Sequence, residues 1–289
     1  MESVPWKNWD EWVSTYELLY SENSLDVQRG CNIVFAWMSK QLIPIAIEST
    51  AEILSALRNQ KNVYELSLAI IRFVNGVIEP YKDVKISSSI QNLCEFLNIP
   101  NDVLNIRNLA THGCIPSYYS CSNVAEECLS WLKKYYWEEQ MKLIVERRED
   151  CFTQILNFFH DGSLPFVNKS KHEIAVFGYP ELIKVITSPE EVSTQIENNK
   201  LCELLNYLDT FIPNSSQYIM SEIYKLSLTD STNAKKWYEY LSNYFRPLPN
   251  YINFTPKASF PPISIGDIPS SDNSLTLNDD EIGYAEINS

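Results

Sequence analysis

Glycine is scarce in this chain, with seven residues in 289. No Gly-x4-Gly-Lys sequence is present, so a phosphate-cradling nucleotide fold is not expected. No apolar run approaches the roughly 18–20 residues that span a bilayer, and the N-terminus lacks the basic and then apolar order of a secretory signal. We therefore expect a protein that stays inside the cell and has no membrane partner.

Metal-binding patterns are lacking as well. The seven cysteines are an odd number without a tight framework, which favours reduced thiols over disulfides. Cys114, Cys121 and Cys128 recur every seven residues, but no close Cys-x2-4-Cys pair typical of zinc sites occurs. Of the three histidines, His160 and His172 have no acidic or cysteine partner at a useful spacing and are expected at the surface. We expect no metal ion and no other cofactor.

Positive charge is also in short supply, since the net charge is -14. Phosphate contacts dominate non-specific binding to nucleic acid, so such a protein repels RNA and DNA at long range. The excess of acidic residues is larger in residues 161–289 than in residues 1–160. Any nucleic-acid role therefore requires a local cationic site or a basic partner, and the first region is the better candidate.

What the chain does have is apolar residues at helical spacing, which predict an all-α fold. Asn8 and Asn101 are expected to cap two of the helices, and Gly113 is expected to end one. Ile174–Phe177 is compatible with either a short strand or the start of a helix. The expected helices are one after Asn8, then Leu25–Lys40, one after Pro44, Val63–Val77, Ser88–Leu97, Asp102–His112, Asn123–Phe159, Pro189–Phe211, Gln217–Leu228 and Ala234–Phe245.

The pattern predicts three regions. Residues 1–160 form an N-terminal helical domain, and residues 161–250 form a second helical region. Residues 251–289 are expected to be a flexible acidic tail. Within it, residues 258–289 contain six acidic residues and no Lys or Arg. Such a composition buries too little apolar surface to fold alone.

Residues 107–113, Arg-Asn-Leu-Ala-Thr-His-Gly, carry the main candidate site. Arg107 is the only Asp, Glu, Lys or Arg between Val103 and Ala125. A lone cation can neutralise charge that develops on a phosphate, and the imidazole of His112 can move protons near neutral pH. The spacing alone is also compatible with a structural arginine and a core histidine.

Helix geometry limits how Arg107 and His112 can act together. Five residues of helix correspond to about 140° of rotation and roughly 7.5 Å of rise. The two side chains therefore do not point at one spot from one straight helix. Either His112 swings from a frayed helix end, or two copies of the helix meet across a two-fold axis and build a composite site.

This stretch resembles the Arg-polar-x3-His motif of HEPN-type ribonucleases. The surrounding chain, roughly residues 5–140, is similar to the Las family of eukaryotic endoribonucleases that process pre-ribosomal RNA. Five segments in this order carry the resemblance: Pro5–Trp12, Leu42–Ala51, Arg72–Gly76, Arg107–Gly113 and Leu129–Trp137.

The resemblance implies an all-helical HEPN bundle in the N-terminal domain and a homodimer formed through it. It further implies metal-independent cleavage of the second internal transcribed spacer of precursor rRNA, with 2′,3′-cyclic phosphate and 5′-hydroxyl ends. A polynucleotide 5′-kinase would be the partner, and the location would be the nucleus and nucleolus. The acidic tail would either dock on the kinase, which the resemblance favours, or be a solvated terminus. The runner-up is a non-catalytic HEPN adaptor that scaffolds RNA-processing partners.

By the same resemblance, Arg107, His112 and Asn108 are the candidate catalytic residues. The family commonly has a second histidine where this chain has Asn108, so each protomer supplies one motif histidine. We therefore expect the two His112 side chains of a dimer to divide the acid and base roles. The candidate substrate-binding residues are Thr111, Tyr118 and Tyr119, although packing or dimer contact is a strong alternative for the tyrosines. Glu48 and Arg72 are expected to form an ion pair, structural or supporting Arg107.

Overall fold

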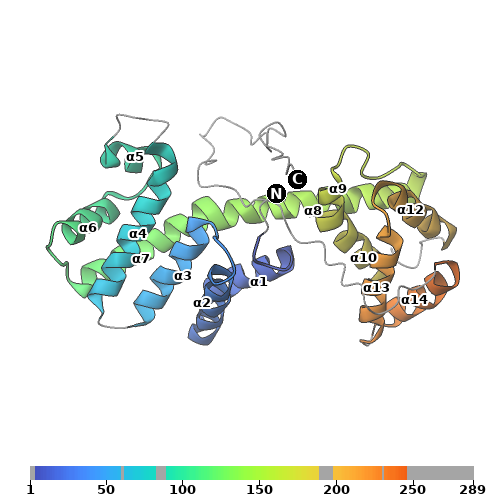
Figure 1. The fold of residues 1–289 in the computed structure, drawn as a ribbon, viewed down its shortest axis with the longest axis horizontal. Helices are drawn as coiled ribbons and strands as arrows, with labels where there is room; N and C mark the ends of the chain where they lie inside the picture. Colours follow the sequence, from blue (N-terminus) through green and yellow to red (C-terminus); the bar gives the residue numbers. More distant parts are fainter. Residues whose placement is uncertain (1–3, 60–61, 83–88, 189–197, 230, 246–289) are drawn as a thin grey trace, which may run out of the picture. The chain divides into compact units, whose positions relative to one another are not determined.

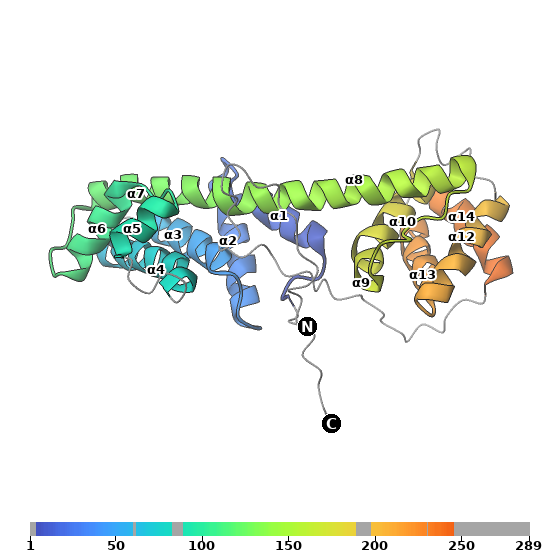
Figure 2. The ribbon, with the colours of Figure 1, turned by 90° about the horizontal axis from the view of Figure 1, so that it is seen from above.

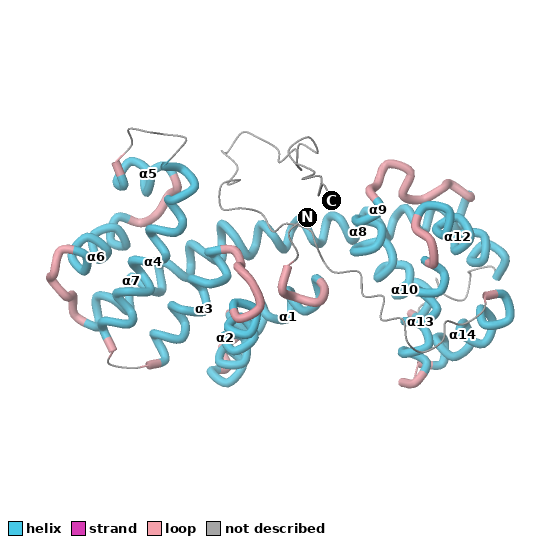
Figure 3. Tube along the Cα trace, viewed as in Figure 1, coloured by secondary structure: helices cyan, strands magenta, loops and turns pink. Residues whose placement is uncertain are grey.

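The computed structural model describes residues 4–59, 62–82, 89–188, 198–229 and 231–245. These residues form helices and connecting loops, with no strand in any of the described ranges (Figure 3). The predicted all-α fold is therefore confirmed. The described residues fall into two compact units, whose boundary in the sequence lies between Lys142 and Leu143. The acidic tail lies outside the described residues, and the domain limits at residues 160 and 250 stay predictions.

The first unit is a helical bundle built around α4. Helix α4 packs against α3 on one side and contacts α6 and α7, while α2 packs against α1 and α3 (Figures 1 and 2). The helices of this unit are α1 (Trp9–Leu19), α2 (Ser24–Met38), α3 (Ile45–Arg58), α4 (Val63–Lys82), α5 (Ile90–Phe96), α6 (Asn101–Thr111), α7 (Tyr118–Leu132) and the π-helical segment η1 (Lys133–Trp137).

The start of α1 shows why these residues begin a helix there. The side chain of Asn8 accepts a hydrogen bond from the backbone N–H of Glu11 at 2.9 Å. Glu11 reciprocates, because its Oε2 accepts from the backbone N–H of Lys7 at 2.7 Å. Each side chain thus satisfies an N–H that has no partner within the helix. The cap predicted at Asn8 is confirmed.

A second predicted cap is wrong. Helix α6 begins at Asn101 itself, and the residue at the N-cap position is Pro100, which makes no side-chain hydrogen bond there. Proline lacks a backbone N–H and has a fixed φ, so it suits a chain that is about to enter a helix. The helix end was predicted correctly, since Gly113 has a φ of 91°. Such a left-handed conformation favours glycine because it has no Cβ.

Tryptophan and tyrosine side chains fill the core between α1, α3 and η1. Trp12 and Trp137 are fully buried, with ring centroids 4.8 Å apart. The indole N–H of Trp137 donates to the hydroxyl of Thr50 at 3.0 Å. Because burying an unpaired N–H is unfavourable, this bond fixes the orientation of the ring as well as contributing to stability.

The second unit consists of helices and connecting loops in its described part. The sequence of Ile174–Phe177 is compatible with a strand or a helix, and the structure shows a helix: Ile174 starts the π-helical segment η2. Residues 189–197, predicted as part of a helix, lie outside the described residues. The helices are α8 (Glu138–Asp161, shared with the first unit), α9 (Lys171–Glu173), η2 (Ile174–Gly178), α10 (Tyr179–Thr187), α12 (Asn198–Phe211), α13 (Ser215–Ser227) and α14 (Thr232–Tyr244).

Candidate functional site

Helix α6 carries Arg107 and is held by its apolar face. Val103, Leu104 and Ile106 are buried, and the helix packs against α4 and α7. Arg107 follows the last of these and is half-buried. Its side chain therefore leaves a fixed helix at the edge of the core, where neighbouring groups can hold it in place.

Two asparagine side chains hold the guanidinium of Arg107. Its Nε and Nη2 both donate to Oδ1 of Asn75, at 3.3 and 2.9 Å. Its Nη1 donates to Oδ1 of Asn108 at 3.0 Å. A guanidinium has five N–H groups, so one N–H on each terminal nitrogen is left by these three bonds. Two such groups side by side match the geometry of a phosphate.

The charge of Arg107 is not neutralised by a carboxylate. Among the described residues, no Asp or Glu side chain forms an ion pair with it. Arg72, on α4, is the opposite case: it pairs with Glu48, and its Nη1 lies 2.8 Å from Oε1 of Glu52. A guanidinium held by neutral amides keeps its full charge for a ligand, whereas one held by two carboxylates does not.

The charge of Arg107 affects the pKa of the neighbouring Cys94 thiol. Burial raises the pKa of Cys94, and the nearby guanidinium of Arg107 acts in the opposite direction by favouring the thiolate. Glu95 adds to the rise. The guanidinium of Arg107 therefore lies close enough to Cys94 to favour the charged form of its thiol.

His112 lies at the C-terminal end of α6. It is the C-cap residue, and its backbone N–H donates to the carbonyl of Asn108 at 3.0 Å. Gly113 then turns the chain, and the N–H of Cys114 donates to the carbonyl of Leu109 at 3.1 Å. This pattern closes the helix without fraying its backbone. The imidazole is exposed and makes no hydrogen bond with any residue in the described ranges, so it is accessible to a substrate.

The three predicted substrate-binding residues have different surroundings. The Thr111 hydroxyl donates to the carbonyl of Arg107 at 2.7 Å, within its own helix. The Tyr118 hydroxyl donates to the carbonyl of Leu57 at 3.2 Å, so this ring ties α7 to α3. Tyr119 is 75% exposed. The contacts favour packing for Tyr118 and leave Tyr119 as the aromatic ring available for stacking on a base.

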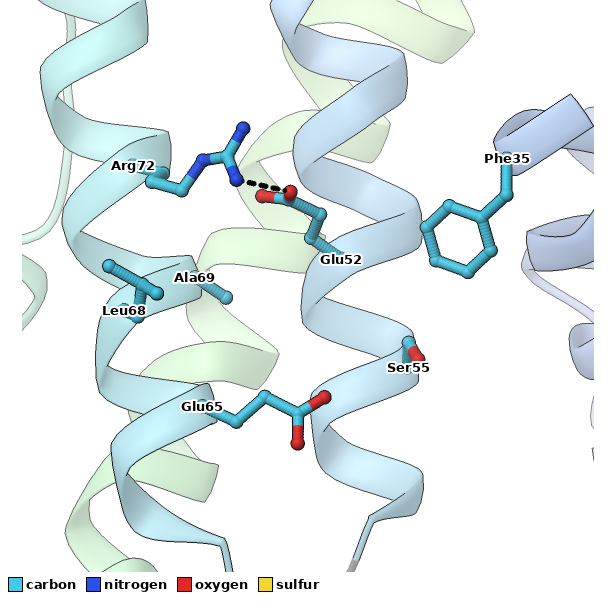
Figure 4. A pocket seen from close by; sticks show the side chains of 7 residues that line it. All are labelled: Phe35, Glu52, Ser55, Glu65, Leu68, Ala69 and Arg72. Carbon is cyan, nitrogen blue, oxygen red and sulfur yellow. Dashed lines mark ion pairs between the residues drawn. The ribbon is translucent and has the colours of Figure 1, made fainter. Parts of the chain in front are cut away.

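Glu48 and Arg72 form the predicted ion pair, and Glu52 joins it. Burial raises the pKa of Glu52, although Arg72 opposes the rise and Glu48 adds to it. Arg72 stands at the edge of a cleft of about 220 Å³ between α3 and α4 (Figure 4). The cleft is lined by Phe35, Glu52, Ser55, Glu65, Leu68, Ala69 and Arg72. The ion pair connects two helices and lies one turn of α4 before Asn75.

Residues 4–139 match the family described as Las1-like. This N-terminal region belongs to the Las1-like family. The match spans all the helices that hold Arg107, Asn75 and Glu48, and it ends within the first turn of α8. The resemblance proposed from the five sequence segments is confirmed for this region.

Curated relatives match about half of this chain. The pre-rRNA-processing protein las1 of Schizosaccharomyces pombe is 28% identical over 145 residues, covering 47% of this chain and 31% of that protein. The ribosomal biogenesis protein LAS1L of Mus musculus is 26% identical, covering 48% and 19%. Protein LAS1 of Saccharomyces cerevisiae is 27% identical, covering 47% and 31%. The match thus spans less than a third of each relative's length.

Sequence patterns placed Arg107, Asn108 and His112 on the right helix but did not single out Asn75. Asn75 lies within the Arg72–Gly76 segment, which is one of the five that carry the family resemblance, but it is outside the arginine–histidine motif. Its contact with Arg107 joins residues 32 positions apart. No local spacing predicts such a contact. The available signal was an asparagine within the stretch Phe73–Ile78 of α4, whose other residues are apolar or glycine, because a polar group in such surroundings needs a partner.

The described residues of both units hold neither a metal-binding cluster nor a membrane-spanning helix. No group of three or more His, Cys, Asp or Glu side chains in those ranges is placed to hold a metal ion. Within the same ranges, no helix is both long and apolar enough to cross a membrane. All seven cysteines are described, and each is a free thiol. Of the two remaining histidines, His160 is exposed, while burial lowers the pKa of the half-buried His172.

Proposed function

We propose that this protein is a metal-independent endoribonuclease of the HEPN type, with Arg107 and His112 at its site. The observation that carries the proposal is the guanidinium of Arg107, fixed by two amide oxygens, with no carboxylate partner in the described residues. Such a group suits a phosphodiester, whose charge increases as the reaction proceeds. The exposed imidazole of His112 supplies proton transfer in the same motif.

In the proposed reaction the RNA 2′-hydroxyl attacks the adjacent phosphorus. A base takes the proton of that hydroxyl as the new P–O bond forms. The P–O bond to the 5′-oxygen breaks, and an acid protonates this leaving oxygen. The products are a 2′,3′-cyclic phosphate and a 5′-hydroxyl. Arg107 would bind the non-bridging oxygens, on which charge accumulates in the transition state.

One imidazole per chain does not supply both an acid and a base at once, so we propose a homodimer in which each protomer contributes His112. Asn108 then orients the guanidinium, because its Oδ1 already holds Nη1 of Arg107. A mixed dimer of wild-type and His112→Ala chains tests the division of roles. We expect it to lose nearly as much activity as the dimer with two substituted chains. Full activity in the mixed dimer would contradict the division.

The substrate proposed is precursor rRNA, cleaved in its second internal transcribed spacer. The choice of precursor rRNA is supported by the names of the relatives, which describe pre-rRNA processing and ribosome biogenesis. The choice of spacer rests on the family resemblance of the sequence segments alone. We also propose a polynucleotide 5′-kinase partner, because the products carry a 5′-hydroxyl, and a location in the nucleus and nucleolus. Deleting residues 258–289 should weaken recovery of the kinase with the protein, and unchanged recovery would argue against docking by the tail.

A non-catalytic adaptor is the competing function, and one observation favours it. Asn108 occupies the position where the family commonly has a second histidine, so the motif has lost one titratable group. If the protein is an adaptor, His112→Ala should leave RNA cleavage by the purified complex unchanged. If the protein is the nuclease, His112→Ala should abolish that cleavage.

A further inference from the structure

The contact between Asn75 and Arg107 joins two helices at the candidate site. Asn75 lies on α4 and Arg107 on α6, and one side-chain oxygen accepts both Nε–H and Nη2–H. Because both bonds converge on one atom, they fix the plane of the guanidinium as well as its position. Asn108, on the same helix as Arg107, holds only Nη1. Asn75 is therefore the residue outside the Arg107–His112 motif that fixes the orientation of the Arg107 guanidinium.

We propose that Asn75 is a positioning residue for Arg107, and that the neutrality of its amide is what the site requires. This inference rests on the proposed function. Asn75 aims the guanidinium at the phosphate while leaving its charge unpaired. The residue has no place in the arginine–histidine motif, and it prepares Arg107 rather than touching the reacting atoms.

The neighbouring turn of α4 shows why neutrality matters. Arg72 lies three residues before Asn75, and its guanidinium is held by the carboxylates of Glu48 and Glu52. A carboxylate at position 75 would hold Arg107 at least as firmly, because an ionised acceptor makes the stronger hydrogen bond. It would also compete with phosphate for the same charge. A residue that only joins α4 to α6 would serve better as Asp, whereas one that prepares an anion site must stay uncharged.

Asn75 could be a structural tie between α4 and α6 or a positioning residue for Arg107. These two roles predict opposite orders of activity for Asn75→Asp and Asn75→Ala. Asn75→Asp keeps the shape and the acceptor but adds a charge, which the adjacent guanidinium keeps ionised at neutral pH. Asn75→Ala removes the acceptor and adds no charge. For a purely structural tie, activity follows stability, so the Asp variant stays close to wild type and the Ala variant falls below it. For a positioning residue with required neutrality, the Asp variant is the less active of the two.

The experiment uses the full-length protein with its partner and a spacer RNA. Thermal unfolding is measured beside kcat and KM, and binding is measured with an RNA whose 2′-hydroxyl at the cleavage site is replaced by hydrogen. We expect Asn75→Asp to unfold no earlier than wild type yet to lose about 100-fold in kcat/KM. Asn75→Ala should lose about tenfold, mainly in kcat, because its guanidinium is charged but no longer aimed.

Salt dependence gives a readout that a structural role does not change. Losing one phosphate contact on single-stranded RNA lowers the slope of log binding constant against log salt by about 0.7. We expect this decrease for Asn75→Asp. The matched control is Asn105→Asp, which adds the same charge at an exposed position of α6. It should leave activity and slope near wild type.

The outcomes separate this inference from the proposed function. If Arg107→Ala still cleaves RNA, the proposed site itself is wrong. If Arg107→Ala is inactive but Asn75→Asp is as active as wild type, the site stands and the role of Asn75 is overturned. If Asn75→Asp fails to fold, an Asn75→Ala variant with unchanged kcat overturns the inference, and a tenfold lower kcat with normal folding supports it.

Discussion

The guanidinium of Arg107 and the side-chain oxygen of Asn75 are joined by two hydrogen bonds, of 3.3 and 2.9 Å, across α4 and α6. The planar fork of arginine is required for this arrangement, because Nε and Nη2 must reach the same oxygen while Nη1 reaches Asn108. A lysine ammonium has three donors on one atom and cannot span both amides.

Arg107→Lys should therefore be nearly as inactive as Arg107→Ala, even though the charge is kept. We expect a loss of about 100-fold or more in kcat/KM. The rate is measured with a spacer RNA at a saturating concentration of the kinase partner. Arg29→Lys is the matched control, since Arg29 has an exposed side chain and pairs only with Asp26 among the described residues. Retention of more than half the activity in Arg107→Lys would mean that charge alone suffices.

His112→Ala should lose activity in a way that depends on the leaving group. If His112 of one protomer protonates the 5′-oxygen, an RNA with sulfur in that position needs no acid, because a thiolate leaves readily. We expect the variant to lose about 100-fold or more on the normal RNA and clearly less on the sulfur-containing RNA. Equal losses on both substrates would contradict a role for His112 as the acid.

Gly76→Ala should destabilise the first unit and affect the site through Asn75. A Cβ at Gly76 would collide with the side chain of Ile45 on α3, so the two helices approach each other too closely for a larger residue. Overpacking of this kind destabilises by about 1–3 kcal/mol. Ile45→Ala shortens the side chain that the new Cβ would meet. The double variant Gly76→Ala, Ile45→Ala should therefore lose less free energy of unfolding than the sum of the losses in the two single variants. Strict additivity in urea unfolding would exclude the collision.

These contacts show which features a sequence reveals. Helix existence, the Asn8 cap and the Gly113 end were predicted because each depends on residues a few positions apart. The cap at Asn101 was mispredicted because Pro100 precedes it and suits the N-cap position without a side-chain hydrogen bond. The motif residues were found by spacing and family resemblance.

What the sequence did not reveal depends on tertiary packing. The contact of Asn75 with Arg107, and the addition of Glu52 to the Glu48–Arg72 pair, arise only when α3, α4 and α6 pack together. Sequence reasoning also offered Tyr118 and Tyr119 as equivalent candidates. The contact of Tyr118 with Leu57 on α3 distinguishes them, and nothing in the local sequence marks it.

Removing the buried hydrogen bond between Trp137 and Thr50 should lower stability without a direct effect on the site. Thr50→Val keeps the volume but leaves the indole N–H unpaired in a fully buried position. Leaving a buried donor unsatisfied destabilises by about 1–3 kcal/mol. Trp137→Phe in the same background should show a coupling between the two positions in a double-mutant cycle. Independent effects would contradict the contact.

Thiol reactivity should separate one cysteine from the buried ones. Cys114 is exposed, whereas burial raises the pKa of Cys31 to about 11 and that of Cys151 to about 12. Only the thiolate reacts, so at pH 8 roughly a thousandth or less of these buried thiols is reactive. A thiol reagent should therefore modify Cys114 first in the native protein, and Cys114→Ser should remove the fast phase. A fast phase that survives the substitution would contradict the burial pattern.

Metal-independent cleavage at Arg107 and His112 is tested most directly by identifying the RNA ends that form in the presence of a chelator. Wild-type, Arg107→Ala and His112→Ala proteins are incubated with spacer RNA and excess chelator, with and without the kinase. We predict that the wild type still cleaves, leaving a 2′,3′-cyclic phosphate and a 5′-hydroxyl, and that neither variant does. Cleavage abolished by the chelator would contradict the metal-independent reaction, and cleavage that survives both substitutions would contradict the assigned site.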